Sequence, residues 1–134
     1  MKFKVGFATD DGKNMVDKHF GDAGFYLIYE ISKKESVFVE KRENSSTEED
    51  ERFHGDPLKA GKIGQIMKGV QILCNKQFGK NIINMSKKFV PILFDIDNID
   101  EAIKITQSRF DEIEQAWKAG GSRKHISFRT KNIE

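Results

Sequence analysis

Short apolar runs in the first third of the chain have the pattern of β-strands. Residues 2–9, KFKVGFAT, alternate between polar and apolar positions and then become apolar. Residues 25–31, FYLIYEI, are aromatic and β-branched, and residues 37–42, VFVEKR, alternate again. Because turn residues separate these runs, they predict an antiparallel meander of three strands.

The rest of the chain alternates between helical and strand patterns. A first helix is predicted to begin at Asp56, a capping residue, and Pro57, which suits the first helical position. The last helix has the clearest apolar stripe, with Asn98 as its predicted cap and Gly120-Gly121 at its end. Helices are predicted at 56–69 and 98–121, a turn followed by a helix at 75–89, and the strands between them at 70–74 and 90–94.

This order of elements predicts an α/β fold with three layers, α/β/α. A meander followed by βαβ units gives a mixed five-stranded sheet in the order 3-2-1-4-5, with strand 2 antiparallel and helices on both faces. The first and fourth strands are then parallel neighbours, and their connections diverge at the carboxyl ends, which opens a crevice. Loops 10–24 and 74–79 border this crevice, so the topology predicts that His19 and Cys74 lie at the same end of the sheet.

Composition narrows the class of protein. The chain has 134 residues, of which 37% are hydrophobic and 33% charged, so we expect one soluble domain over 1–118 and a flexible basic tail over 119–134. The net charge of +2 does not favour nucleic acid as a partner. The single cysteine excludes an internal disulfide and favours a cytoplasmic location. No segment approaches the ~20 apolar residues of a membrane span, and the amino-terminal segment lacks the pattern of a signal peptide.

The segment His19-Phe20-Gly21 has two interpretations. In the first, Phe20 is a core residue and Gly21 supplies a backbone conformation closed to other residues. In the second, His19 is a ligand of a metal or a metal cluster, because neutral imidazole binds iron and other transition metals. His54, in RFHGDP, is a second candidate imidazole ligand or, alternatively, a residue that only marks the entry to the first helix.

Cys74 ends a predicted strand and also has two interpretations. A lone cysteine is often a small core residue. At a strand-to-helix junction, however, helix N-terminal N–H groups favour an anion and lower the pKa of a thiol, and Lys76 and Lys80 add positive charge. Phe78 and Gly79 belong to the same predicted binding turn, where Gly79 lets a ligand approach the backbone. One histidine and one cysteine are too few for a closed zinc site but suffice to hold a preassembled polyanionic cluster transiently.

These segments resemble the dinitrogenase iron–molybdenum cofactor biosynthesis family, which includes NifX- and NafY-type proteins and the carboxyl-terminal domain of NifB. The resemblance is carried by an apolar strand with a polar loop, then HFGDAGFYLIYEI, a His-Gly entry to a helix, the strands that follow, and NIDEAI. It covers about residues 1–116. Asp22 stands where the family usually has a basic residue, and CNKQFG replaces a more glycine-rich turn.

The resemblance implies a ribonuclease-H-like fold and binding of an iron–molybdenum cofactor or a related iron–sulfur cluster precursor. It implies a carrier or chaperone role, with metallocluster donor and acceptor proteins as partners. His19 matches the motif histidine of the family and is the ligand that the resemblance implies. Cys74 is not implied by the family and rests on the topology alone.

Two other functions stay open from the sequence. One is a regulatory or interaction domain that uses the acidic segment 43–51 or the basic tail. The other is a two-metal nuclease of the ribonuclease-H type, for which Asp10 and Asp11 follow the first strand, although Cys74-Asn75 places no carboxylate at the end of the fourth. The sequence contains no evident nucleophile–base pair or phosphate-binding loop, so we expect a binding protein rather than an enzyme.

Overall fold

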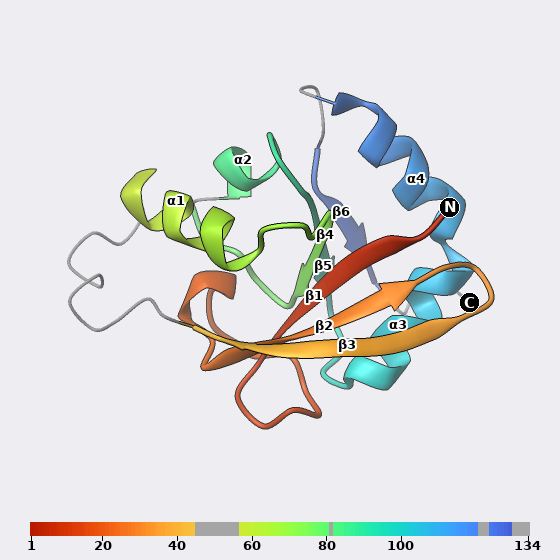
Figure 1. Ribbon diagram of the computed structural model, residues 1–134, viewed down its shortest axis with the longest axis horizontal. Helices are drawn as coiled ribbons and strands as arrows, with labels where there is room; N and C mark the ends of the chain where they lie inside the picture. The colour runs from red at the N-terminus through yellow and green to blue at the C-terminus, as the bar shows by residue number, and fades with distance from the viewer. Residues whose placement is uncertain (45–56, 81, 121–123, 130–134) are drawn as a thin grey trace.

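A six-stranded mixed sheet runs through the middle of the molecule, with its strands in the order β3-β2-β1-β4-β5-β6 (Figure 1). The computed structural model describes residues 1–44, 57–80, 82–120 and 124–129. The strands are β1 (Phe3–Thr9), β2 (Phe25–Ile31), β3 (Ser36–Glu43), β4 (Ile72–Asn75), β5 (Val90–Phe94) and β6 (Ile126–Phe128). The helices are the 3-10 helix η1 (Phe20–Asp22) and the α-helices α1 (Pro57–Ile66), α2 (Ile82–Met85), α3 (Ile99–Ser108) and α4 (Phe110–Lys118).

Strand directions bring four strand ends to one edge of the sheet. β2 is antiparallel to its neighbours β1 and β3, whereas β1, β4, β5 and β6 run parallel to one another. These four strands end at Thr9, Asn75, Phe94 and Phe128, and we call this edge of the sheet the carboxyl edge. The predicted α/β fold, mixed sheet and order 3-2-1-4-5 are confirmed, with β6 added beside β5. The ribonuclease-H-like character that the resemblance implies stays a prediction.

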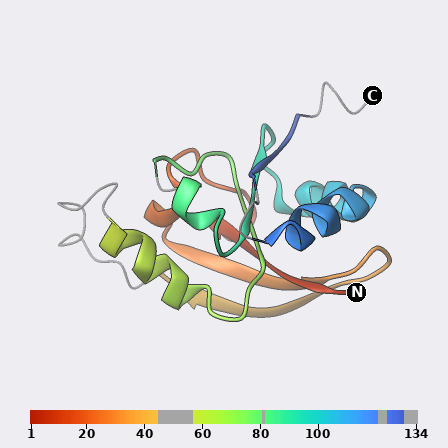
Figure 2. The ribbon, with the colours of Figure 1, turned by 90° about the horizontal axis from the view of Figure 1, so that it is seen from above.

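Helices cover both faces of the sheet (Figure 2). On one face, Val5 and Phe7 of β1 pack in a core that includes residues of α3 and α4. On the other face, Ala8 and Leu73 pack with residues of α1, α2 and η1. Successive residues of a strand point to opposite faces, so the central strands are buried on both sides and read as nearly continuous apolar runs.

Two predicted helices differ from the observed ones. The segment 75–89, predicted as a turn followed by a helix, has a helix of only a single turn, α2, and Gly79, with φ of +76°, lies in the non-helical stretch before it. The helix predicted at 98–121 divides at Arg109 into α3 and α4. Arg109 has φ −110° and ψ 23°, and its guanidinium lies 5.2 Å from the centre of the Phe128 ring. The bend therefore occurs where the helical segment passes β6.

β6 is an element that the sequence pattern did not predict. It lies within the segment expected to be a basic tail and pairs in parallel with β5. Phe128 is buried, and its ring centre lies 5.8 Å from that of Phe94 in an edge-on contact. Three residues are too few for an alternating pattern to stand out among the basic residues around them.

Some predictions fall on residues outside the described ranges. These are the helix cap Asp56, the candidate ligand His54 and residues 45–51 of the acidic segment. α1 begins at Pro57, as the sequence predicts. Among the described residues, no helix combines the length and the apolar character needed to cross a membrane.

Candidate functional site

The loop that follows β1 begins with a turn held by Thr9 and Asp11. Asp11 Oδ1 accepts hydrogen bonds from the backbone N–H groups of Lys13 and Asn14, both at 2.8 Å. The Thr9 hydroxyl accepts one from the Gly12 N–H at 2.9 Å and donates one to the Asn14 carbonyl at 2.7 Å. Hydrogen bonds to its ionised form lower the pKa of Asp11 to about 2. The Asp11 carboxylate is therefore engaged in the structure of the turn.

Asp10 joins the two ends of the same loop. Its Oδ2 pairs with Lys18 Nζ at 2.8 Å, and its Oδ1 accepts a hydrogen bond from the Gly24 N–H at 2.7 Å. The hydrogen bond from Lys18 holds the pKa of Asp10 below its usual value. The described residues contain no group of three or more His, Cys, Asp or Glu side chains that could hold a metal ion.

Asn75, the last residue of β4, holds the loop against the sheet. Its side chain is fully buried and makes three hydrogen bonds. Oδ1 accepts from the Val16 N–H at 3.1 Å, and Nδ2 donates to the carbonyls of Lys18 and Gln77 at 2.8 and 2.9 Å. One amide thus fixes the loop after β1 and the turn after β4 relative to each other. A polar residue at the end of a buried strand was the sequence signal for this role, since buried polar groups are hydrogen-bonded.

Phe20 anchors the middle of the loop in the core. Its ring is fully buried, stacks on Phe78 at a centroid distance of 5.2 Å and lies 4.9 Å from the ring of Tyr26. The Tyr26 hydroxyl donates to the Phe20 carbonyl at 2.8 Å, and burial raises the pKa of Tyr26. The interpretation of Phe20 as a core residue is confirmed, and Phe78 is equally a core residue. Gly21 lies in η1 without a positive φ, so the special backbone conformation expected there is absent.

His19 lies at the carboxyl edge, between η1 and the turn after β4. It pairs with Gln77 in an isolated β-bridge, and its imidazole packs against Gly79. A Cβ atom built at Gly79 would lie 2.6 Å from His19 Nδ1, so a larger residue there would displace the imidazole. The sequence-predicted residues His19 and Gly79 are therefore brought together.

The His19 side chain is 37% exposed to solvent, and Asp22 Oδ2 lies 3.8 Å from its Nδ1 atom. That distance is too long for a hydrogen bond but short enough for electrostatic attraction when the imidazole is protonated. We call His19, Asp22, Gln77 and Gly79 the histidine edge.

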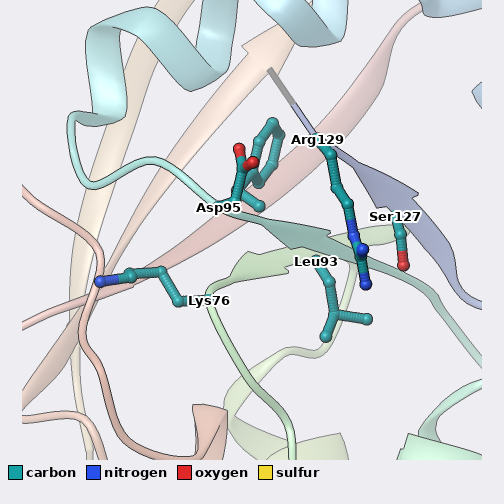
Figure 3. A pocket seen from close by; sticks show the side chains of 6 residues that line it. Lys76, Leu93, Asp95, Ser127 and Arg129 are labelled. Atoms are coloured by element: carbon teal, nitrogen blue, oxygen red, sulfur yellow. The ribbon is translucent and has the colours of Figure 1, made fainter. Parts of the chain in front are cut away.

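Lys76 follows β4 directly. Its Nζ pairs with Asp97 Oδ1 at 2.6 Å, and this hydrogen bond raises the pKa of Lys76. The positive charge that Lys76 was expected to add is thus partly compensated by Asp97. The Lys76 side chain also lines a hollow of about 300 Å³ at the carboxyl edge (Figure 3).

Cys74 lies in the core, on the face of the sheet covered by α3 and α4. Its thiol is fully buried, and burial raises its pKa well above the usual value. Phe20 and Phe78 belong to the core of the opposite face, so the structure does not bring the thiol to the histidine edge. The expected helix N-terminus beside Cys74 is also absent, because α2 begins only at Ile82. These observations favour the interpretation of Cys74 as a small core residue.

The fold and this site define a three-layer α/β protein that presents a half-exposed histidine at the carboxyl edge of its sheet. The sequence model of the dinitrogenase iron–molybdenum cofactor family matches residues 1–108, and the chain belongs to this family.

A solved structure shares the fold. It is a crystal structure of a protein from Methanocaldococcus jannaschii described as a candidate dinitrogenase, with 20% sequence identity and a TM-score of 0.57. The match covers 81% of this chain and 90% of that one. At this identity, the likeness supports the fold alone. A search of curated proteins returns no match.

Proposed function

We propose that this chain binds an iron–molybdenum cofactor, or a related iron–sulfur cluster, as a cargo. In this proposal it is a carrier without catalytic activity that takes the cluster from a donor protein and passes it to an acceptor in the cytoplasm. The observation that carries the proposal is the half-exposed imidazole of His19 at the carboxyl edge, in a chain of this family.

The donor set suits a transient cargo. Neutral imidazole is a ligand for iron and other transition metals. His19 supplies one such ligand at the histidine edge, whereas structural metal sites use four ligands and catalytic sites three. A preassembled cluster that gains a single protein ligand can be released again without rearrangement of the fold.

The surroundings of His19 suit a bulky ligand. The contact with Gly79 leaves no side chain beneath the imidazole, and Phe20 and Asn75 fix the loop from below. Lys80 directly follows Gly79 and is exposed, so it offers positive charge to a polyanionic cluster. Asp22 opposes this charge, which favours weak rather than tight binding.

The test is an anaerobic titration of the full chain with iron–molybdenum cofactor and, separately, with a simple iron–sulfur cluster. Binding is measured by visible absorption and by co-elution of metal with protein on gel filtration. We expect retention near one cluster per chain, and a marked loss in His19→Ala. His125→Ala is the matched control, because His125 is a second exposed histidine that precedes β6. Cys74→Ala should retain the cluster, since the thiol is buried.

Retention that is equal in the wild type and in His19→Ala would contradict the proposed ligand. Absence of retention by a folded wild-type chain would contradict the carrier function for these cargoes.

An interaction module is the second candidate, favoured by the surface of β3. Val37, Phe38 and Val39 are 57%, 51% and 40% exposed on this edge strand. Exposed apolar side chains on an unpaired strand edge are typical of sites that bind another protein. Such a surface also suits a carrier that meets donor and acceptor proteins. The titration separates the two functions, because only the carrier retains a cluster.

A further inference from the structure

The hollow at the carboxyl edge has features of a second binding site. Its residues come from the ends of β4, β5 and β6 and the positions just after them (Figure 3). They are Lys76, Leu93, Phe94, Asp95, Ser127 and Arg129. Leu93 and Ser127 are paired positions of β5 and β6, and Arg129 follows Ser127 by two residues. The three side chains therefore lie on one face, and Figure 3 shows them side by side.

Two cationic side chains line the hollow, those of Lys76 and Arg129, and in the described part of the chain only Lys76 is paired with a carboxylate. Among the described residues, its guanidinium has no hydrogen-bond or ion-pair partner. Lys76, by contrast, pairs with Asp97, and its side chain extends away from Leu93 and Arg129 in Figure 3. The positive charge available to a ligand is therefore that of Arg129.

We propose that this hollow binds a small monocarboxylate. The planar guanidinium of Arg129 matches a carboxylate through two parallel N–H···O hydrogen bonds, and the Ser127 hydroxyl lies beside it as a further donor. The partly buried Leu93 side chain offers apolar surface to a short hydrocarbon body. The Asp95 carboxylate in the wall opposes a second negative charge on the ligand, which disfavours phosphate.

This site is independent of the proposed cluster binding. It uses none of the residues of the histidine edge. Ser127 and Arg129 also lie beyond residues 1–108, the part of the chain that the family model covers. The two residues that supply the polar contacts to the ligand therefore come from β6 and the position just after it.

Amide NMR of the ¹⁵N-labelled full chain tests the proposal, with sodium butyrate and sodium phosphate titrated separately at constant ionic strength. We expect saturable shifts with butyrate at Leu93, Ser127 and Arg129, and no saturable shift there with phosphate. Arg129→Gln should weaken butyrate binding by about tenfold or more, because a charge-assisted pair is lost. Arg129→Lys should also weaken it, since lysine keeps the charge but lacks the planar fork. Lys104→Gln, which removes an exposed cation from α3, is the matched control and should bind as the wild type does.

Three results would overturn the proposal. They are the absence of saturable shifts with butyrate, equal binding in Arg129→Gln and the wild type, and phosphate binding at these residues as tightly as butyrate. None of these results bears on cluster retention by His19.

Discussion

The position of the His19 imidazole depends on the absence of a side chain at Gly79. Gly79 has no side chain, and the imidazole occupies the space where a Cβ atom would lie. The sequence singled out His19 and Gly79 as residues of one site, and the structure brings them into contact. The sequence could not reveal which face of the sheet the Cys74 side chain occupies, because a shift of one residue along a strand moves a side chain to the opposite face.

Gly79→Ala tests this contact. The substitution adds a Cβ atom 2.6 Å from His19 Nδ1 and places alanine at φ +76°, so we expect loss of about 1–2 kcal/mol of stability and weaker cluster retention. Gly69→Ala is the control, because Gly69 has φ +83° and no atom within 4 Å of the added Cβ. It should lose similar stability by urea denaturation and retain the cluster fully. Equal retention by both variants would show that Gly79 does not position His19.

Asp11 gives a second prediction at this scale, for the pH dependence of the loop. Its pKa is lowered from 3.8 to about 2 by the N–H groups of Lys13 and Asn14. Since the folded-state pKa is depressed, ionised Asp11 stabilises the fold above pH 3.8, and this contribution is lost as the pH falls towards 2. Carboxyl NMR should show a titration midpoint near 2 for Asp11. A midpoint near 3.8 would mean that the turn is not formed as described.

At the scale of elements, the site depends on how the loop after β1 is joined to β4. The order of β1 to β5 was predictable because each of these strands has an apolar or alternating run. Asn98 caps α3 as expected, accepting a hydrogen bond from the Glu101 N–H at 2.9 Å. The helix expected after a turn within 75–89 is shorter than predicted, since only the single turn α2 forms. Its apolar residues have helical spacing, but Phe78 packs with Phe20 in the core before any helix begins. Tertiary packing overrides a local pattern here.

Asn75→Ala tests the junction between the loop and β4. The substitution leaves the Val16 N–H and the carbonyls of Lys18 and Gln77 without their partner, so we expect a loss of about 1–3 kcal/mol. Hydrogen exchange should also become faster for the Val16 amide. Asn84→Ala, at an exposed position of α2, is the matched control and should be close to neutral. Slow exchange at Val16 in Asn75→Ala would argue that other contacts hold the loop.

At the scale of the whole molecule, the sheet has one more strand than the sequence pattern predicted. The family model matches residues 1–108, and β6 lies beyond that range, where it forms an edge strand of the sheet beside β5. The sequence pattern missed this strand because a short run of three residues in a basic segment carries no clear periodicity. Phe128 supplies the packing that fixes it, between Phe94 and the guanidinium of Arg109.

Phe128→Ala tests whether β6 is part of the folded unit. Removal of a fully packed phenylalanine ring should cost about 3–5 kcal/mol of unfolding free energy, measured by urea denaturation. Ile126→Ala, at a half-buried position of the same strand, should cost less. A loss below about 1 kcal/mol in Phe128→Ala would indicate that β6 adds little to the fold.

The central claim is that His19 binds the cluster directly, and pulsed electron paramagnetic resonance tests it most directly. The chain is prepared with ¹⁵N-labelled histidine, loaded anaerobically with the cluster, and measured in a paramagnetic oxidation state. The account predicts a hyperfine coupling from one imidazole nitrogen in the wild type and in His125→Ala, and its loss in His19→Ala. A retained cluster with no histidine coupling, or a coupling that persists in His19→Ala, would contradict it.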